Sequence, residues 1–271
     1  MYPNPLKAIS RKLTDDIVIT SVPFTRSNLF NFGGRMALLK FGDDIIVWSA
    51  IPHSVEVEKA IALFSSPTAS VTHLIIPDQE HTLAAVSFKE KYPNLKIIGP
   101  ETVDLGPKTP IDYKLTESLA NKILDKTNLS EDLGVDSSSA LNNLQFVYFP
   151  SHANKELVVY DTKSKILFEG DLLFNLGAHE PSEQYSPATG YAKDFNPHGG
   201  LSFLTRYMQP YSKVGGALMR KVSSAGTPQA KRGLQAIYSW DFEQVVPCHG
   251  NVISKNAKEA FANVFKSSLE K

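Results

Sequence analysis

The most informative stretch of the sequence is Pro150-Ser-His-Ala-Asn-Lys-Glu-Leu-Val-Val-Tyr-Asp-Thr-Lys-Ser-Lys-Ile-Leu-Phe-Glu-Gly-Asp171. The runs 156–160 and 165–168 are apolar, and turn-forming residues at 161–164 separate them, so we predict a β-hairpin. His152 precedes the first strand, and Asp171 follows the second. Polar side chains at strand ends of a rigid scaffold commonly bind ligands or metals. This stretch therefore predicts both a β-hairpin and a site beside it.

The hairpin belongs to a larger alternation of strands and helices. A second hairpin is predicted from 36–41 and 45–50, with turn residues Gly42-Asp43-Asp44 between them. The order strand, polar loop, helix, strand runs from 71 to 99, which is typical of layered α/β folds. Further strands are predicted at 145–149 and 242–247, and further helices at 55–64, 112–126, 201–211, 228–240 and 255–269.

The remaining segments are irregular but do not divide the chain. Residues 130–143 are rich in Ser, Asp, Asn and Gly and are expected to form a surface loop. The long polar stretch 175–200 is unusual inside a compact domain, and such loops are often functional. We see no repeat or linker. We therefore predict a single domain over residues 1–271, with the C-terminal helix at about 255–269.

Composition excludes several classes of protein. Lys and Arg (28) balance Asp and Glu (28), so the formal net charge is zero, whereas nucleic-acid binders normally carry a basic patch. No run approaches the ~20 apolar residues of a membrane span, and residues 1–12 lack the apolar core of a secretory signal. We expect a soluble cytoplasmic protein that acts on a small molecule and has no nucleic-acid or membrane partner; the oligomeric state is left open.

Four polar side chains stand at ends of predicted apolar strands: His81, His152, Asp171 and His249. Imidazole and carboxylate groups together are ligands for Zn, Fe or Mn. Because Cys248 is the single cysteine, no thiolate cluster is available. Any metal site is therefore expected to use nitrogen and oxygen ligands. The simpler alternatives are that His81 caps the following helix, that His152 bonds to loop backbone and that Asp171 is a turn residue.

Three segments in this order resemble the second half of the metallo-β-lactamase fold: 150–161 with its Pro-Ser-His, 166–174 with Gly170-Asp171, and 246–250 with Pro-Cys-His-Gly. The resemblance covers roughly residues 28–255. The segments Phe32-Gly-Gly-Arg-Met, Trp48-Ser-Ala-Ile-Pro and Ile76-Pro-Asp-Gln-Glu-His81 are similar to a divergent, DUF4336-like branch of that superfamily. The resemblance implies a four-layer αββα sandwich of the α/β class, with the site at one edge between two sheets.

The superfamily's H-x-H-x-D-H motif is altered here. If His81 matches its last histidine, Glu80 stands for the Asp, Asp78 for the second His and Ile76 for the first. A register shifted by one residue leaves the roles of Asp78 and Glu80 interchangeable. The first metal position of the family would then lose at least one ligand, which favours one ion rather than two.

The resemblance implies a metal site built from Asp78, His81, His152, Asp171 and His249, and it leaves Glu80 as the catalytic acid–base group. We expect a divalent metal, zinc first, with iron or manganese as alternatives. A metal with an open coordination position activates water for hydrolysis.

We therefore expect a metal-dependent hydrolase of a small ester, thioester, lactone or phosphoester. The alternatives are a degenerate, non-catalytic binding protein of the same fold and an iron-containing oxidoreductase.

Overall fold

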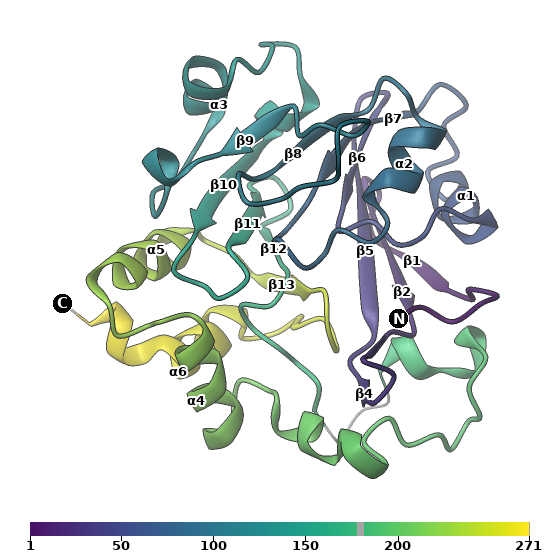
Figure 1. The fold of residues 1–271 in the computed structure, drawn as a ribbon, viewed down its shortest axis with the longest axis vertical. Coiled ribbons are helices and arrows are strands. Elements are labelled where there is room, and N and C mark those ends of the chain that lie inside the picture. Colours follow the sequence, from purple (N-terminus) through teal and green to yellow (C-terminus); the bar gives the residue numbers. More distant parts are fainter. Residues whose placement is uncertain (178–181, 271) are drawn as a thin grey trace.

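A computed structural model describes residues 1–177 and 182–270 of the protein, in which two β-sheets lie face to face. Helices α1 and α2 cover the outer face of one sheet, and α4, α5 and α6 cover the outer face of the other (Figure 1). This arrangement is the four-layer αββα sandwich predicted from the sequence. The described helices are α1 (Val55–Ala62), α2 (Ala85–Lys91), α3 (Lys126–Leu133), α4 (Lys213–Val222), α5 (Pro228–Ser239) and α6 (Ala257–Leu269).

The larger sheet combines an antiparallel half with a parallel half. Its order within the described residues is β1 (Ile9–Thr14), β2 (Ile17–Val22), β5 (Gly34–Phe41), β6 (Asp44–Trp48), β7 (Ser70–Ile75), β8 (Lys96–Pro100) and β9 (Tyr113–Leu115). The β5–β6 hairpin and the parallel β7–α2–β8 unit confirm two predictions. The short strands β3 (Thr25–Arg26) and β4 (Phe30–Asn31) pair with each other.

The smaller sheet contains the stretch that opened the sequence analysis. Its strands are β10 (Leu144–Phe149), β11 (Glu156–Asp161), β12 (Ile166–Glu169) and β13 (Gln244–Pro247), in that order. The β11–β12 hairpin has the predicted antiparallel pairing, and β13 joins β12 in parallel. Because β12 and β13 run in parallel, the segments that follow them, which carry Asp171 and His249, leave the sheet at the same edge.

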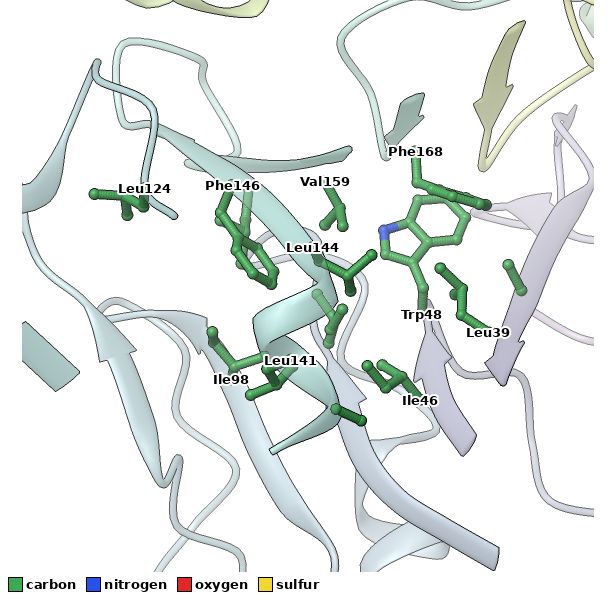
Figure 2. Packing of buried hydrophobic residues seen from close by; sticks show 14 of the residues in the cluster. Leu39, Ile46, Trp48, Ile98, Leu124, Leu141, Leu144, Phe146, Val159 and Phe168 are labelled. Atoms are coloured by element: carbon green, nitrogen blue, oxygen red, sulfur yellow. The ribbon is translucent and has the colours of Figure 1, made fainter. Parts of the chain in front are cut away.

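Three clusters of buried apolar side chains fill the three interfaces between the layers. The central cluster lies between the sheets, where Trp48 of one sheet packs against Phe168 of the other with ring centroids 5.6 Å apart (Figure 2). Such aromatic pairs contribute about 0.5–1.5 kcal/mol beyond the burial of their area. The packing fixes the two sheets relative to each other, and so fixes the edge where the polar segments meet.

Two parts of the secondary structure differ from prediction. The helix predicted over 112–126 is wrong: Tyr113–Leu115 forms strand β9 against β8, and α3 starts only at Lys126. The reason is Asp125, whose side chain accepts hydrogen bonds from the backbone of Thr127 and Asn128 and therefore starts a helix. The predicted loop 130–143 accordingly contains the end of α3. Strands β1 and β2 and helix α4 were not predicted.

The long polar stretch 175–200 lacks α-helix and strand within its described part. It contains the short 3₁₀ helices Glu183–Tyr185 and Pro187–Thr189, and Gly200–Tyr207 follows as a longer 3₁₀ helix in place of the helix predicted over 201–211. In Figure 1 this green segment runs along one edge of the molecule, beside β4, and leads into α4. No helix within residues 1–177 and 182–270 has both the length and the apolar character needed to cross a membrane.

Candidate metal centre

Three side chains from distant parts of the chain converge at the edge between the sheets. They are His81 from the β7–α2 loop, Asp171 after β12 and His249 after β13. His81 Nε2 lies 3.2 Å from His249 Nε2, which lies 3.3 Å from Asp171 Oδ1. One donor atom from each residue lies within 4.8 Å of the others. Two imidazoles and a carboxylate therefore face one common point.

His81 is oriented by the carboxylate of Asp78. Asp78 Oδ2 lies 2.7 Å from His81 Nδ1, and Asp78 Oδ1 accepts hydrogen bonds from the backbone N–H groups of Glu80 and His81. Asp78 is fully buried. A carboxylate bonded to one ring nitrogen leaves the other nitrogen to a metal, as in many metal sites. Asp78 thereby directs His81 Nε2 toward His249 and Asp171.

His249 is oriented by backbone rather than by a carboxylate. Its Nδ1 lies 2.6 Å from the carbonyl oxygen of Gly33, to which it donates. The following residue, Gly250, has φ +85°, and a Cβ there would collide with the carbonyl of Asn175. Gln184 accepts a hydrogen bond from the Gly250 N–H at 3.1 Å. A glycine is therefore required after His249, and the tight turn it makes places the imidazole.

Asp171 is positioned by two hydrogen-bonded neighbours. Buried Glu156 accepts hydrogen bonds from the N–H groups of Gly170 and Asp171, at 2.5 and 3.1 Å. The amide of Asn154 donates to Asp171 Oδ2 at 2.5 Å. Because Oδ2 is bound to Asn154, Oδ1 is the oxygen that faces His249.

The electrostatics of the three side chains favour a cation between them. Burial raises the pKa of Asp171, but the hydrogen bond from His249 and the charges of His81 and His249 outweigh it, so its pKa is lowered. Burial lowers the pKa of His81, but the Asp78 carboxylate and the Cys248 thiol outweigh it and raise its pKa well above the ordinary value. His81 Nε2 and His249 Nε2 lie 3.2 Å apart. Without a metal, one of them must carry a proton and donate it to the other.

This donor set fits a divalent transition metal. Nitrogen and oxygen donors suit Zn, Fe and Mn, and each imidazole already has its second nitrogen engaged, by Asp78 or by Gly33. Three protein donors leave at least one coordination position open toward the neighbouring cavities. A hydrolytic site requires such an open position.

The structure places the other predicted site residues around this trio rather than in it. His152 Nε2 is buried with no hydrogen-bond partner among the described residues, while its Nδ1 accepts from the Asn154 N–H at 3.2 Å. Glu80 is 44% exposed and pairs with Arg26 at 3.3 Å. His152 therefore does bond to the loop backbone, as the simpler alternative proposed, but only through Nδ1. Helix α2 has Ala84 as its N-cap, so His81 does not cap it.

Two cavities open on either side of His249. The first, of about 40 Å³, is bordered by His81, Glu80 and Cys248. The second, of about 180 Å³, is bordered by His152, Asp171 and apolar side chains. Phe24 and Arg26 border both cavities together with His249. The three candidate ligands are therefore reachable by a small molecule from two directions.

Several residues that build the site were not found from the sequence. Gln184 is buried and donates to the carbonyls of Gly34 and Cys248, so it ties β5 to the segment of His249. It lies in the 175–200 stretch, whose length was the one available signal. Asn154 and Glu156 lie inside the stretch that begins at Pro150, but nothing in their spacing indicated a role.

Two further buried side chains lie close to the site. Arg35 donates to the carbonyl of Pro247 at 2.6 Å. It lies between the sheets because Arg35 shares the inward face of β5 with Ala37 and Leu39. Strand β13 ends at Pro247, and the Cys248 side chain that follows borders the cavity of His81.

Comparison with known proteins shows similarity in structure but not in sequence. No family description matches the chain, and no curated protein matches it. The structure is similar to the DIM-1 metallo-beta-lactamase (TM-score 0.58, 13% identity, 99% of each chain). It is also similar to a metallo beta lactamase from Hirschia baltica (0.58, 11% identity, 98% of this chain and 99% of that one) and to FIM-1 from Pseudomonas aeruginosa in its mono-zinc form (0.57, 13%, 99% of each).

These similarities extend over nearly the whole chain, at identities that establish the fold alone. The predicted DUF4336-like branch stays a prediction, as does the single-domain assignment. The chain therefore has the metallo-β-lactamase fold.

Proposed function

We propose that the protein is a metal-dependent hydrolase of a small ester, thioester, lactone or phosphoester, with zinc as the expected ion and iron or manganese as alternatives. The observation that supports it is the convergence of His81, Asp171 and His249, which each place one donor atom within 4.8 Å of the other two. Each of these three side chains is held by a second contact, which is typical of a built site rather than a chance cluster.

We propose a single ion rather than two. In a two-metal site, Asp171 would share its carboxylate between the ions, but Asn154 occupies Asp171 Oδ2. Asp78 is engaged by His81 and by two backbone N–H groups. Ile76, at the first motif position, is buried and has no donor atom. Of the five predicted ligands, His152 remains outside the trio with a ring nitrogen that has no partner among the described residues.

In this proposal each side chain has a distinct task. A bound ion would lower the pKa of a coordinated water to roughly 7 and would polarise the substrate. Asp78 and the Gly33 carbonyl keep the two imidazoles in their ligating orientation. Glu80 borders the cavity of His81; Arg26 engages its Oε2, and its Oε1 is the oxygen that would accept a proton from the nucleophile.

A non-catalytic binding protein is the second candidate, and the altered motif favours it. Ile76 and Asp78 stand where the family has two histidines, so the first metal position is depleted. Such a protein would bind a metal and a small molecule without turnover.

The test is hydrolysis of a panel of aryl esters, thioesters, lactones and phosphoesters by metal-loaded protein, before and after treatment with a chelator. We expect turnover of at least one class, its loss on chelation and its return on adding zinc. The variant Glu80→Gln should lower kcat about 10²–10⁴-fold while metal content stays unchanged. Glu58→Gln, an exposed change on α1, serves as the matched control.

Metal binding without turnover of any class would support the binding protein instead. A visible absorption band from bound iron, with electron transfer in place of hydrolysis, would support the oxidoreductase.

A further inference from the structure

We propose that the substrate carries an apolar acyl chain, which binds in the larger cavity and extends over the 3₁₀ helix Gly200–Tyr207 and α4. This inference rests on the proposed function, because it places the reacting carbonyl at the metal centre. It narrows the substrates to acyl esters, thioesters or lactones.

The larger cavity has one polar end, and its other walls are mainly apolar. Its polar end is formed by His152, Asn154, Asp171 and His249. The walls are the side chains of Phe24, Phe32, Phe174, Met208, Leu218 and Val222, together with Arg26, which also borders the smaller cavity. Predominantly apolar walls with a few convergent polar groups are typical of small-molecule sites. Apart from Arg26, the polar side chains of this cavity lie where the reacting group would lie.

Aromatic rings enclose His249 on the side of this cavity. The ring centroids of Phe24, Phe32 and Phe174 lie 6.1, 5.5 and 5.8 Å from that of His249. Phe174 stacks on the imidazole with an interplanar angle of 14°. Phe24 and Phe32 flank the β3–β4 hairpin and Phe174 follows β12, and together the three rings make the surroundings of the candidate ligand apolar. A charged substrate group would lose hydration against these rings, whereas an apolar chain would not.

The apolar wall continues onto the surface of the protein. Leu218 of the cavity wall is 41% exposed, and Val214 lies one turn before it on α4 at 66%. Leu201 and Leu204 of the preceding 3₁₀ helix are 62% and 66% exposed. The two elements follow each other along one edge of the molecule (Figure 1). Scattered exposed apolar residues need no explanation, but a group that continues from a cavity indicates a binding surface.

The opposite side of the site does not suit such a chain. The smaller cavity is only about 40 Å³, and the polar or charged side chains of Arg26, Ser49, Glu80 and Cys248 border it beside Tyr2, Phe24 and Leu83. It fits the small leaving group of an acyl substrate. The two cavities share His249, so acyl chain and leaving group would lie on either side of the metal ligands.

The test measures binding of saturated fatty acids of six to twelve carbons to the zinc-supplemented protein by calorimetry, below their micelle concentrations. Each added methylene that enters the cavity should tighten Kd by about fourfold, the equivalent of ~0.8 kcal/mol. The variant Leu218→Asp places a carboxylate in the wall and should flatten this dependence on chain length. Val55→Asp, the same kind of change at a more exposed apolar position on α1, should leave it unchanged.

A Kd that does not change with chain length would overturn the inference, as would a Leu218→Asp variant that behaves like Val55→Asp. Because the cavity walls are protein side chains, the chain-length dependence is measurable even if no metal binds. Loss of metal binding with the dependence intact would contradict the proposed function alone. Metal binding and turnover without the dependence would contradict this inference alone.

Discussion

Replacing His249 by Ala, or Asp171 by Asn, is expected to reduce bound zinc from near one equivalent per chain to background. Each change removes one of three converging donors, and the two donors that remain cannot enclose an ion. His152→Ala should weaken binding but retain the ion, because His152 lies beside the trio rather than in it. The measurement is elemental analysis of each variant after metal-supplemented expression and extensive dialysis.

Asp78→Asn separates two roles for that residue. If Asp78 orients His81, the change should weaken zinc affinity by about 10–100-fold. If Asp78 is itself a ligand, the change should abolish zinc binding as His249→Ala does. His53→Ala is the control, because His53 lies beside Tyr92 on the α1–α2 face. Equal metal content in the His249, Asp171 and His53 variants would refute the site.

Glu156→Ala is expected to lower the free energy of unfolding by about 2–6 kcal/mol, the largest effect on stability that we predict. The change leaves the N–H groups of Gly170 and Asp171 without acceptors, at about 1–3 kcal/mol for each buried group. Burial and the neighbouring Asp78 and Glu169 carboxylates raise the pKa of Glu156 well above its usual value. Removing Glu156 also removes its repulsion with these two carboxylates. Because the raised pKa limits the ionised fraction of Glu156, this gain offsets only part of the lost stability.

Urea unfolding of the metal-free protein measures this effect without a contribution from metal binding. Glu156→Gln keeps one acceptor oxygen and should lose roughly half as much stability. The control is Glu243→Ala, whose exposed ion pair with Lys165 should contribute about 0–1 kcal/mol. A loss of less than about 1 kcal/mol in Glu156→Ala would show that the loop of Asp171 does not depend on this carboxylate.

The parts of the fold that could be predicted are those with strong local signals. The β11–β12 hairpin combines two apolar runs with a polar turn, and the β7–α2–β8 unit alternates in the same way. Residues 112–126 were predicted as a helix, but pairing with β8 makes Tyr113–Leu115 a strand. Pairing of that kind depends on the tertiary structure, which local propensity does not contain.

The candidate ligands were accessible from the sequence because each follows a strand, and strand ends meet at one edge. The residues that surround them were not. Asn154 and Gln184 act through loop conformations, and Phe24 and Phe32 reach His249 only because the β3–β4 hairpin folds over it. Contacts between loops follow no sequence period, so no pattern indicates them.

The most direct test of the metal centre is anomalous diffraction at the zinc edge from crystals grown with zinc. We expect one strong peak, about 2.0–2.2 Å from His81 Nε2, His249 Nε2 and Asp171 Oδ1. Two peaks of equal height sharing the Asp171 carboxylate would contradict the single-ion proposal. The absence of any peak between these three side chains would contradict the metal centre itself.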